Sequence, residues 1–177
     1  MSSTEVLRLN PGSDSPDSVE TMETLRNSHG SAPVIWDQMC QMYLGTEPYG
    51  WCNEETTNKL WPLYKDKKIP EHRRALLMMT FDTIYVSKKD YPRAAKDIRK
   101  WLEEFPPAEG RVNHWARFAE IYESDPDCAA IGVYHTSVSE NPFKGDWDEE
   151  ADEEGPVDWE DASDLYIELE LDEEIEQ

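Results

Sequence analysis

The stretch from residue 70 to residue 124 constrains the fold most, because it predicts three consecutive amphipathic helices. Apolar side chains recur in it at three- and four-residue spacing, which is the period of one face of a helix. The helices are expected at 70–87, 90–105 and 113–124, and the short connections between them favour antiparallel packing. The apolar positions of the three faces are Leu76, Leu77, Phe81, Ile84 and Tyr85, then Tyr91, Ala95, Ile98, Leu102 and Phe105, then Trp115, Phe118, Ala119 and Tyr122.

Two more helices are predicted ahead of this stretch. One begins at Ser31 and ends at Gly45, a residue type that favours the left-handed conformation found at helix C-termini. A shorter helix begins at Asn53, whose side chain suits the N-cap position. The helical core is therefore expected to contain four or five helices.

Two strands are predicted to follow the helices. Residues 129–138 include β-branched and aromatic side chains, and residues 165–171 alternate leucine or isoleucine with tyrosine or glutamate. Such alternation is typical of a half-buried strand, here with an acidic outer face. Because a two-stranded ribbon is marginal alone, we expect a small antiparallel sheet that lies against the helices. The predicted fold class is α+β, with a helical core followed by the sheet and an acidic C-terminal segment.

The first part of the chain is rich in serine, aspartate and threonine, so residues 1–30 are expected to form a flexible N-terminal tail. Residues 4–9 leave an alternative, because they form a short extended-looking run that an Asn-Pro-Gly turn signal ends, and they would add a strand to a sheet. The expected organisation is a tail over 1–30, a mainly helical domain over 31–139, and an acidic loop with a C-terminal strand over 140–177.

Charge is distributed very unevenly along the chain. The net charge is −22, yet residues 59–117 contain fourteen basic and eight acidic side chains. Residues 140–177 contain eighteen acidic residues and a single basic residue, Lys144. Net charge of this size is informative about partners rather than about fold.

The acidic segment has three interpretations. It is a solubilising tail, or it covers the basic helices and pairs with Lys96, Arg99 and Lys100, or it binds a cationic partner. Trp147 and Trp159 lie among its acids, whereas purely solvating tails contain few aromatic residues. The basic region is too weakly charged to neutralise the segment, which favours the third interpretation.

The sequence therefore predicts a non-enzymatic acidic binding or inhibitor protein. Its acidic surface would occupy the nucleic-acid-binding site of a basic partner, such as a nuclease, a toxin or a nucleic-acid-binding enzyme. Immunity proteins and DNA mimics that counter defence systems act in this way. The expected partner-binding residues are Trp147, Asp148, Glu149, Glu150, Asp152, Glu153, Glu154, Asp158 and Trp159.

The alternative function is that of a helical adaptor or regulatory subunit, with the acid serving solubility. Its contacts would come from the aromatic loop that contains Tyr49 and Trp51, since these residue types are enriched in interface hot spots. In a further interpretation, these two rings only cover the end of the helical core.

No motif of known catalytic chemistry occurs in the chain. Cys40, Cys52 and Cys128 are widely spaced and are expected to be reduced and structural. Zinc sites need ligand pairs at short spacing, which these cysteines and the four histidines do not provide. Cys128 and His135 would supply a nucleophile and a base, but nothing in the surrounding sequence supports that pair. We expect no catalytic residue, no metal and no cofactor.

Localisation and the remaining partner classes follow from composition. No apolar run approaches the ~20 residues needed to cross a bilayer, and the N-terminus lacks the pattern of a signal peptide. A cytoplasmic protein without membrane contact is expected. Direct binding to nucleic acid is not expected, because the net charge repels phosphate.

Overall fold

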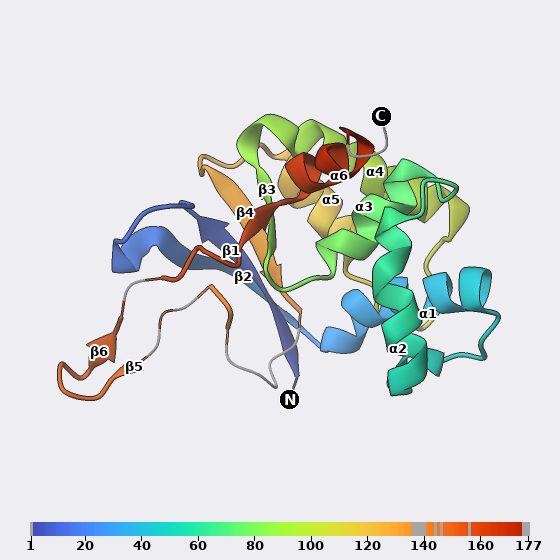
Figure 1. Cartoon of the computed structure of the whole chain (residues 1–177), viewed down its shortest axis with the longest axis horizontal. Helices are drawn as coiled ribbons and strands as arrows, with labels where there is room; N and C mark the ends of the chain where they lie inside the picture. The colour runs from blue at the N-terminus through green and yellow to red at the C-terminus, as the bar shows by residue number, and fades with distance from the viewer. Residues whose placement is uncertain (1, 136–140, 144, 146, 156, 175–177) are drawn as a thin grey trace.

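The computed structural model describes residues 2–135, 141–143, 145, 147–155 and 157–174. It is a mixed α+β structure in which a five-stranded sheet lies beside a group of helices (Figure 1). The α+β class is thus confirmed. The sheet is larger than predicted and does not simply follow the helices, because its strands come from the beginning, the middle and the end of the chain.

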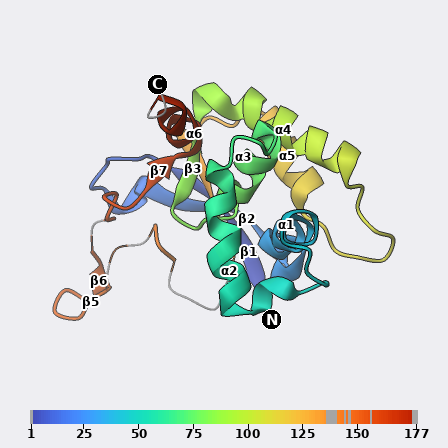
Figure 2. The ribbon, with the colours of Figure 1, turned by 45° about the vertical axis from the view of Figure 1, so that its right-hand side comes forward.

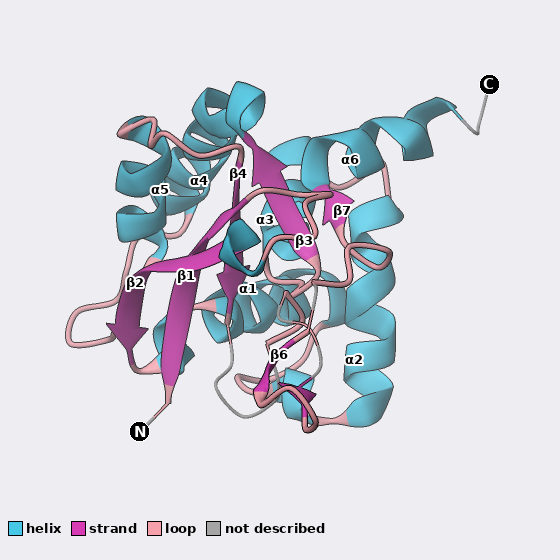
Figure 3. Ribbon diagram, turned by 90° about the vertical axis from the view of Figure 1, so that its left-hand side faces the viewer, coloured by secondary structure: helices cyan, strands magenta, loops and turns pink. Residues whose placement is uncertain are grey.

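The strand order of the main sheet is β2-β1-β4-β3-β7 (Figure 3). Its strands are β1 (Ser3–Leu9), β2 (Val19–Arg26), β3 (Ile84–Ser87), β4 (Ala130–Tyr134) and β7 (Ser163–Asp164). All neighbouring pairs are antiparallel except β3 with β7, which is parallel. The strand predicted within 129–138 is confirmed as β4, whereas residues 136–138 lie outside the described part of the chain.

The expectation of a flexible tail over residues 1–30 is wrong for the described residues. β1 and β2 form a hairpin, and β1 also pairs with β4 through five residues. Val6, Leu7 and Leu9 are almost fully buried, so this segment buries apolar surface on both faces of the sheet. The alternative that residues 4–9 form a strand is therefore confirmed.

The helices are α1 (Ala32–Met39), α2 (Glu54–Leu60), α3 (Glu71–Met79), α4 (Tyr91–Glu104), α5 (Trp115–Glu123) and α6 (Leu165–Glu174). A π-helical turn, Cys40–Leu44, continues α1 and ends at Gly45, which has the expected left-handed conformation. Asn53 caps α2 as predicted, since its side chain accepts hydrogen bonds from the backbone N–H groups of Glu55 and Thr56.

The first helix of the central stretch is shorter than predicted. α3 ends at Met79, and Ile84–Ser87 form β3 instead of a last helical turn. Thr80 follows the helix, and its hydroxyl donates a hydrogen bond to the carbonyl of Leu77 at 2.6 Å. Ile84 and Val86 are β-branched, which favours a strand, and β3 is paired on both sides in the sheet.

The strand predicted at 165–171 is helix α6. Asp164 caps it, because the Asp164 carboxylate accepts hydrogen bonds from the backbone N–H groups of Tyr166 and Ile167. Leucine and glutamate are also good helix formers and are not enriched in strands. A pattern that repeats every two residues also repeats every four. Because residues four apart lie on the same face of a helix, Leu165 and Leu169 share the buried face of α6.

The two faces of the sheet are covered differently. On one face, side chains such as Val6, Ile131 and Val86 belong to the main core with the helices. On the other face, Leu7 and Leu9 contact a smaller cluster that contains Phe143, Tyr134 and Trp159. Part of the C-terminal acidic segment therefore covers the sheet.

Candidate functional site

The most acidic part of the C-terminal segment is a small hairpin. β5 (Trp147–Asp148) pairs antiparallel with β6 (Glu153–Glu154), and Trp147 lies opposite Glu154. The turn is closed by Asp148, whose carboxylate accepts the backbone N–H groups of Glu150 at 2.9 Å and Ala151 at 3.1 Å. The hairpin stands away from the sheet and the helices, at the edge of the molecule (Figure 1).

Trp147 is the most exposed large apolar side chain of the hairpin, with 57% of its surface accessible. The turn and the two strand residues that flank it carry five exposed carboxylates: Asp148, Glu149, Glu150, Asp152 and Glu153. Within the described residues, none of these five forms an ion pair. The hairpin thus presents an exposed indole ring together with five carboxylates that no described cation neutralises. The side chain of Glu154 lies outside the described part.

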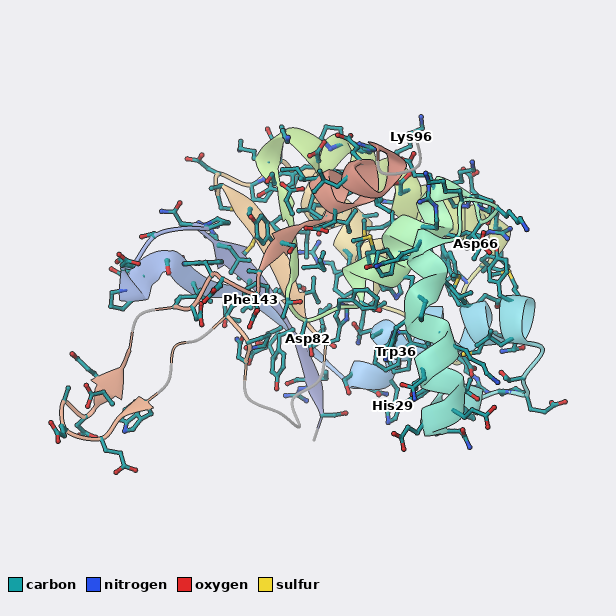
Figure 4. The ribbon with its side chains drawn as sticks, viewed as in Figure 1. His29, Trp36, Asp66, Asp82, Lys96 and Phe143 are labelled. Atoms are coloured by element: carbon teal, nitrogen blue, oxygen red, sulfur yellow. The ribbon has the colours of Figure 1, made fainter. Side chains whose placement is uncertain are left out.

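The other two predicted residues, Asp158 and Trp159, lie apart from the hairpin. Asp158 is exposed, but its carboxylate accepts the backbone N–H of Glu160 at 2.9 Å and so shapes a turn. The Trp159 indole N–H donates to the carbonyl of Ser13 at 2.9 Å. Its ring lies 6.1 Å from that of Phe143, which Figure 4 labels beside the sheet. Trp159 covers the sheet and is not placed as an exposed anchor.

In the aromatic loop of the alternative function, one of the two predicted rings is packed against the core and the other is exposed. Trp51 packs edge-on against Trp36 with 5.3 Å between ring centroids, and Trp36 packs likewise against Trp61. The interpretation that the loop covers the end of the helical core holds for Trp51. Tyr49, in contrast, is 53% exposed and has a left-handed backbone with φ 64°.

On basic helix α4, Arg99 pairs with another helix and not with the acidic loop. Both Nε and Nη2 of Arg99 donate to the carboxylate of Glu123 on α5, at 2.8 and 2.9 Å. For Lys96 and Lys100, no ion pair occurs among the described side chains. The hypothesis that the acidic loop pairs with these cations is therefore wrong for Arg99.

Helix α6 is the part of the C-terminal segment that does pair with the helices. Arg93 donates to Glu170 at 3.0 Å and to Glu71 at 2.6 Å, and its guanidinium lies 4.2 Å from the centre of the Tyr166 ring. The Tyr166 hydroxyl donates to Asp97 at 2.7 Å, which limits the rise that burial causes in the pKa of that carboxyl. These contacts fix α6 on α4.

Sequence reasoning missed two exposed apolar residues on α6. Ile167 and Leu171 are 45% and 48% exposed and lie one helical turn apart. A strand would have buried both of them with Leu169. The capping residue Asp164 distinguishes a helix from a strand here. In a helix that begins after Asp164, Ile167 and Leu171 lie on the outer face.

His135 and Cys128 do not form a nucleophile and base pair. Both ring nitrogens of His135 already have partners, the Ser31 hydroxyl at Nδ1 and the carbonyl of Met79 at Nε2. The Cys128 thiol lies instead 3.3 Å from the hydroxyl of Tyr91. The described residues contain no group of three or more His, Cys, Asp or Glu side chains that would hold a metal ion.

Two further findings bear on classification. Among the helices that the structure describes, none is long and apolar enough to cross a bilayer. Comparison of this chain with models of known protein families, with curated proteins and with solved structures finds no match.

Proposed function

We propose that this chain is a non-enzymatic acidic binding protein whose hairpin, residues 147–154, occupies a cationic site on a basic partner protein. The observation that carries the proposal is the exposed Trp147 ring in one hairpin with five exposed carboxylates that form no ion pair with a described residue. An apolar anchor surrounded by charge is suited to a protein interface, whereas a tail that only aids solubility has no need of an exposed tryptophan.

Electrostatics supports a partner that normally binds nucleic acid. Double-stranded DNA carries one negative charge per ~1.7 Å along its axis, and a protein surface that binds it is correspondingly rich in lysine and arginine. Five carboxylates within residues 148–153 present a similar field on a short hairpin. Such a field attracts cationic surfaces over about a Debye length and speeds association.

The partner class is therefore a nuclease, a toxin or a nucleic-acid-binding enzyme, and the activity is inhibition by occupancy. This is how an immunity protein or a DNA mimic acts, inside the cytoplasm where such partners work. Nucleic acid itself is not proposed as a ligand, since a net charge of −22 repels phosphate.

Reversing three glutamates of the hairpin is expected to slow association. Glu149, Glu150 and Glu153 are the best choice, because Asp148 closes the turn and Asp152 has φ 54° in it. Once wild-type protein has captured its partner, the triple change to lysine should lower the association rate about 10- to 100-fold at low salt. The loss should shrink as added salt screens the charges.

A matched control separates this local effect from net charge. Lysine at Glu103, Glu109 and Asp127 changes the net charge equally, and these exposed acids lie outside the hairpin and form no ion pair with a described residue. Stopped-flow or surface-binding rates at low and high salt compare the two variants. Equal slowing by both, or no salt dependence at all, contradicts the proposal.

Trp147→Ala is expected to act on dissociation instead. Truncating a desolvated interface tryptophan typically costs 2 kcal/mol or more, which corresponds to about a 30-fold faster dissociation rate. The association rate should change little, because the charges remain. The adaptor hypothesis predicts the opposite pattern, in which Tyr49→Ala abolishes binding while Trp147→Ala has no effect. Dissociation rates of the two single variants therefore decide between the functions.

A further inference from the structure

A cleft of about 530 Å³ lies between α1 and the loop that joins α4 to α5. One wall is the outer side of α1 and its π-helical turn, which contribute Val34, Gln38 and Gln41. The opposite wall is the loop 105–113. Figure 2 shows α1 and this loop on the same side of the molecule. The volume of the cleft falls within the ~300–1,000 Å³ that is usual for ligand sites.

The chain around the loop is connected both to the segment that precedes α1 and to α1 itself. His114 donates its backbone N–H to the carbonyl of Gly30 at 2.8 Å, and its Nε2 lies 2.9 Å from the carbonyl of Asn27. Elsewhere, Arg111 Nη1 donates to the Tyr49 hydroxyl at 3.3 Å. The Tyr49 backbone N–H donates in turn to the carboxylate of Asp37 on α1. The loop is thus held at a fixed distance from the helix, and the cleft is preformed.

The backbone around the cleft adopts uncommon conformations. Asn27 and Tyr49, which both line it, have φ values of 69° and 64°. Gln41 lies in the π-helical turn Cys40–Leu44. Non-glycine residues at positive φ and π-helical turns are both enriched at functional sites. Such conformations cost free energy, so they persist only where the surrounding structure stabilises them.

The charged side chains of the lining do not favour a strongly charged ligand. Asp37 and Arg111 carry opposite charges, and both are engaged by Tyr49. In a chain with a net charge of −22, the cleft is therefore close to neutral. Its apolar part includes Val34, Phe105 and Val112, and Val112 is 45% exposed there.

Two side-chain amides line the cleft, that of half-buried Gln38 and that of exposed Gln41. Within the described part of the chain, neither Gln38 nor Gln41 makes a side-chain hydrogen bond. Each amide offers donors and an acceptor, which match the C=O and N–H groups of a peptide main chain. The apolar residues opposite them, Phe105 and Val112, are suited to the side chains of the same ligand.

From this arrangement we infer that the cleft binds a short, extended and uncharged peptide segment. Gln38 and Gln41 bond to its main chain, and the loop 105–113 contacts its apolar side chains. This inference is independent of the acidic hairpin, so one can fail without the other.

The test uses the whole protein and a defined probe. The probe is a degenerate mixture of acetylated and amidated hexapeptides made only of uncharged residues, followed by ¹H–¹⁵N NMR. We expect shifts in the side-chain amide signals of Gln38 and Gln41 and in the backbone of 105–113. A second mixture, with two aspartates or two lysines in each peptide, should shift these signals at least about tenfold less at equal concentration.

Variants decide whether the amides are responsible. Replacing both Gln38 and Gln41 by alanine, a good helix former, should reduce the affinity for the uncharged mixture about tenfold or more. Asn58→Ala on α2 removes an exposed amide outside the cleft and should leave the affinity unchanged. The triple lysine variant of the hairpin should also bind normally. Absent shifts at millimolar peptide, equal shifts with the charged mixture, or unchanged binding by the double variant would each overturn the inference.

Discussion

Replacing Leu169 by alanine is expected to lower the free energy of unfolding by about 2–5 kcal/mol, whereas the same change at Leu171 should cost less than about 1 kcal/mol. Leu169 is 2% exposed on the inner face of α6, and Leu171 is 48% exposed on the outer face. The first substitution leaves a cavity between α6 and the core, and the second removes atoms that already contact solvent. Urea unfolding of both variants measures the difference.

The pair of substitutions also separates a helix from a strand over 165–171. In a strand, residues two apart point to the same side, so Leu169 and Leu171 would be buried equally and cost the same. Equal costs would therefore contradict helix α6. If α6 opened separately from the rest of the molecule, Leu169→Ala would instead raise amide hydrogen exchange within α6, and Leu171→Ala would not.

Several elements of the fold were predictable because their signals are local. The helices at 90–105 and 113–124 each carry a clear apolar face, and Gly45 and Asn53 mark ends that the structure confirms. α6 was also within reach, since Asp164 caps it and leucine with glutamate favours a helix. The alternation of residues 165–171 nevertheless led to the prediction of a strand. The same alternation is equally compatible with a helix, in which Leu165 and Leu169 lie on one face.

Other elements depend on contacts between distant parts of the chain. β1 is stabilised by pairing with β4, about 125 residues away. The extended run at 4–9 left a strand open as an alternative, but the polar composition of residues 1–30 favoured a tail. β3 has only four residues and is set by its two neighbours in the sheet. Tertiary pairing of this kind overrides local preference.

The candidate site shows the same division. That the acidic loop would expose its carboxylates followed from composition, but its hairpin and the identity of the exposed tryptophan did not. Trp159 is held by the carbonyl of Ser13 and by Phe143, and only the fold brings Ser13 to it. Trp147 has no comparable contact among the described residues and remains exposed.

The contribution of His135 to the stability of the protein is expected to fall as the pH is lowered from about 6.5 to about 4. This side chain is 1% exposed, and burial lowers its pKa to about 4, while the hydrogen bond to the Met79 carbonyl opposes the shift. It links three elements, since its ring contacts Ser31 at the start of α1 and Met79 at the end of α3, and its own backbone follows β4.

The sign follows from proton binding in the two states. In the unfolded chain the imidazole has its ordinary pKa of ~6.5 and takes up a proton as the pH falls below that value. The folded protein keeps the ring neutral down to about pH 4. Between these values the unfolded state binds more protons, so the contribution of His135 is fully present above about pH 6.5. It is lost by about pH 4, at roughly 1.4 kcal/mol per pH unit and roughly 3 kcal/mol in total.

Other groups contribute with the opposite sign, so the effect must be measured as a difference between proteins. Burial raises the pKa values of Asp82, Asp90 and Asp97, and these carboxyls stabilise the fold increasingly as the pH falls. Relief of repulsion among the excess carboxylates acts in the same direction. A variant that changes only residue 135 retains both effects.

His135→Gln is the matched variant, because a glutamine amide also offers a donor for the Met79 carbonyl but does not titrate. We expect it to be less stable than the wild type at pH 7.5, since the Ser31 contact is lost, and the gap should narrow by about 2 kcal/mol at pH 5. Guanidinium chloride unfolding at pH 7.5, 6 and 5 provides the comparison and screens the surface charges. If the two proteins lost stability in parallel over this range, the prediction would be contradicted. His135 would then have the same pKa in the folded and unfolded states, despite its burial between α1, α3 and β4.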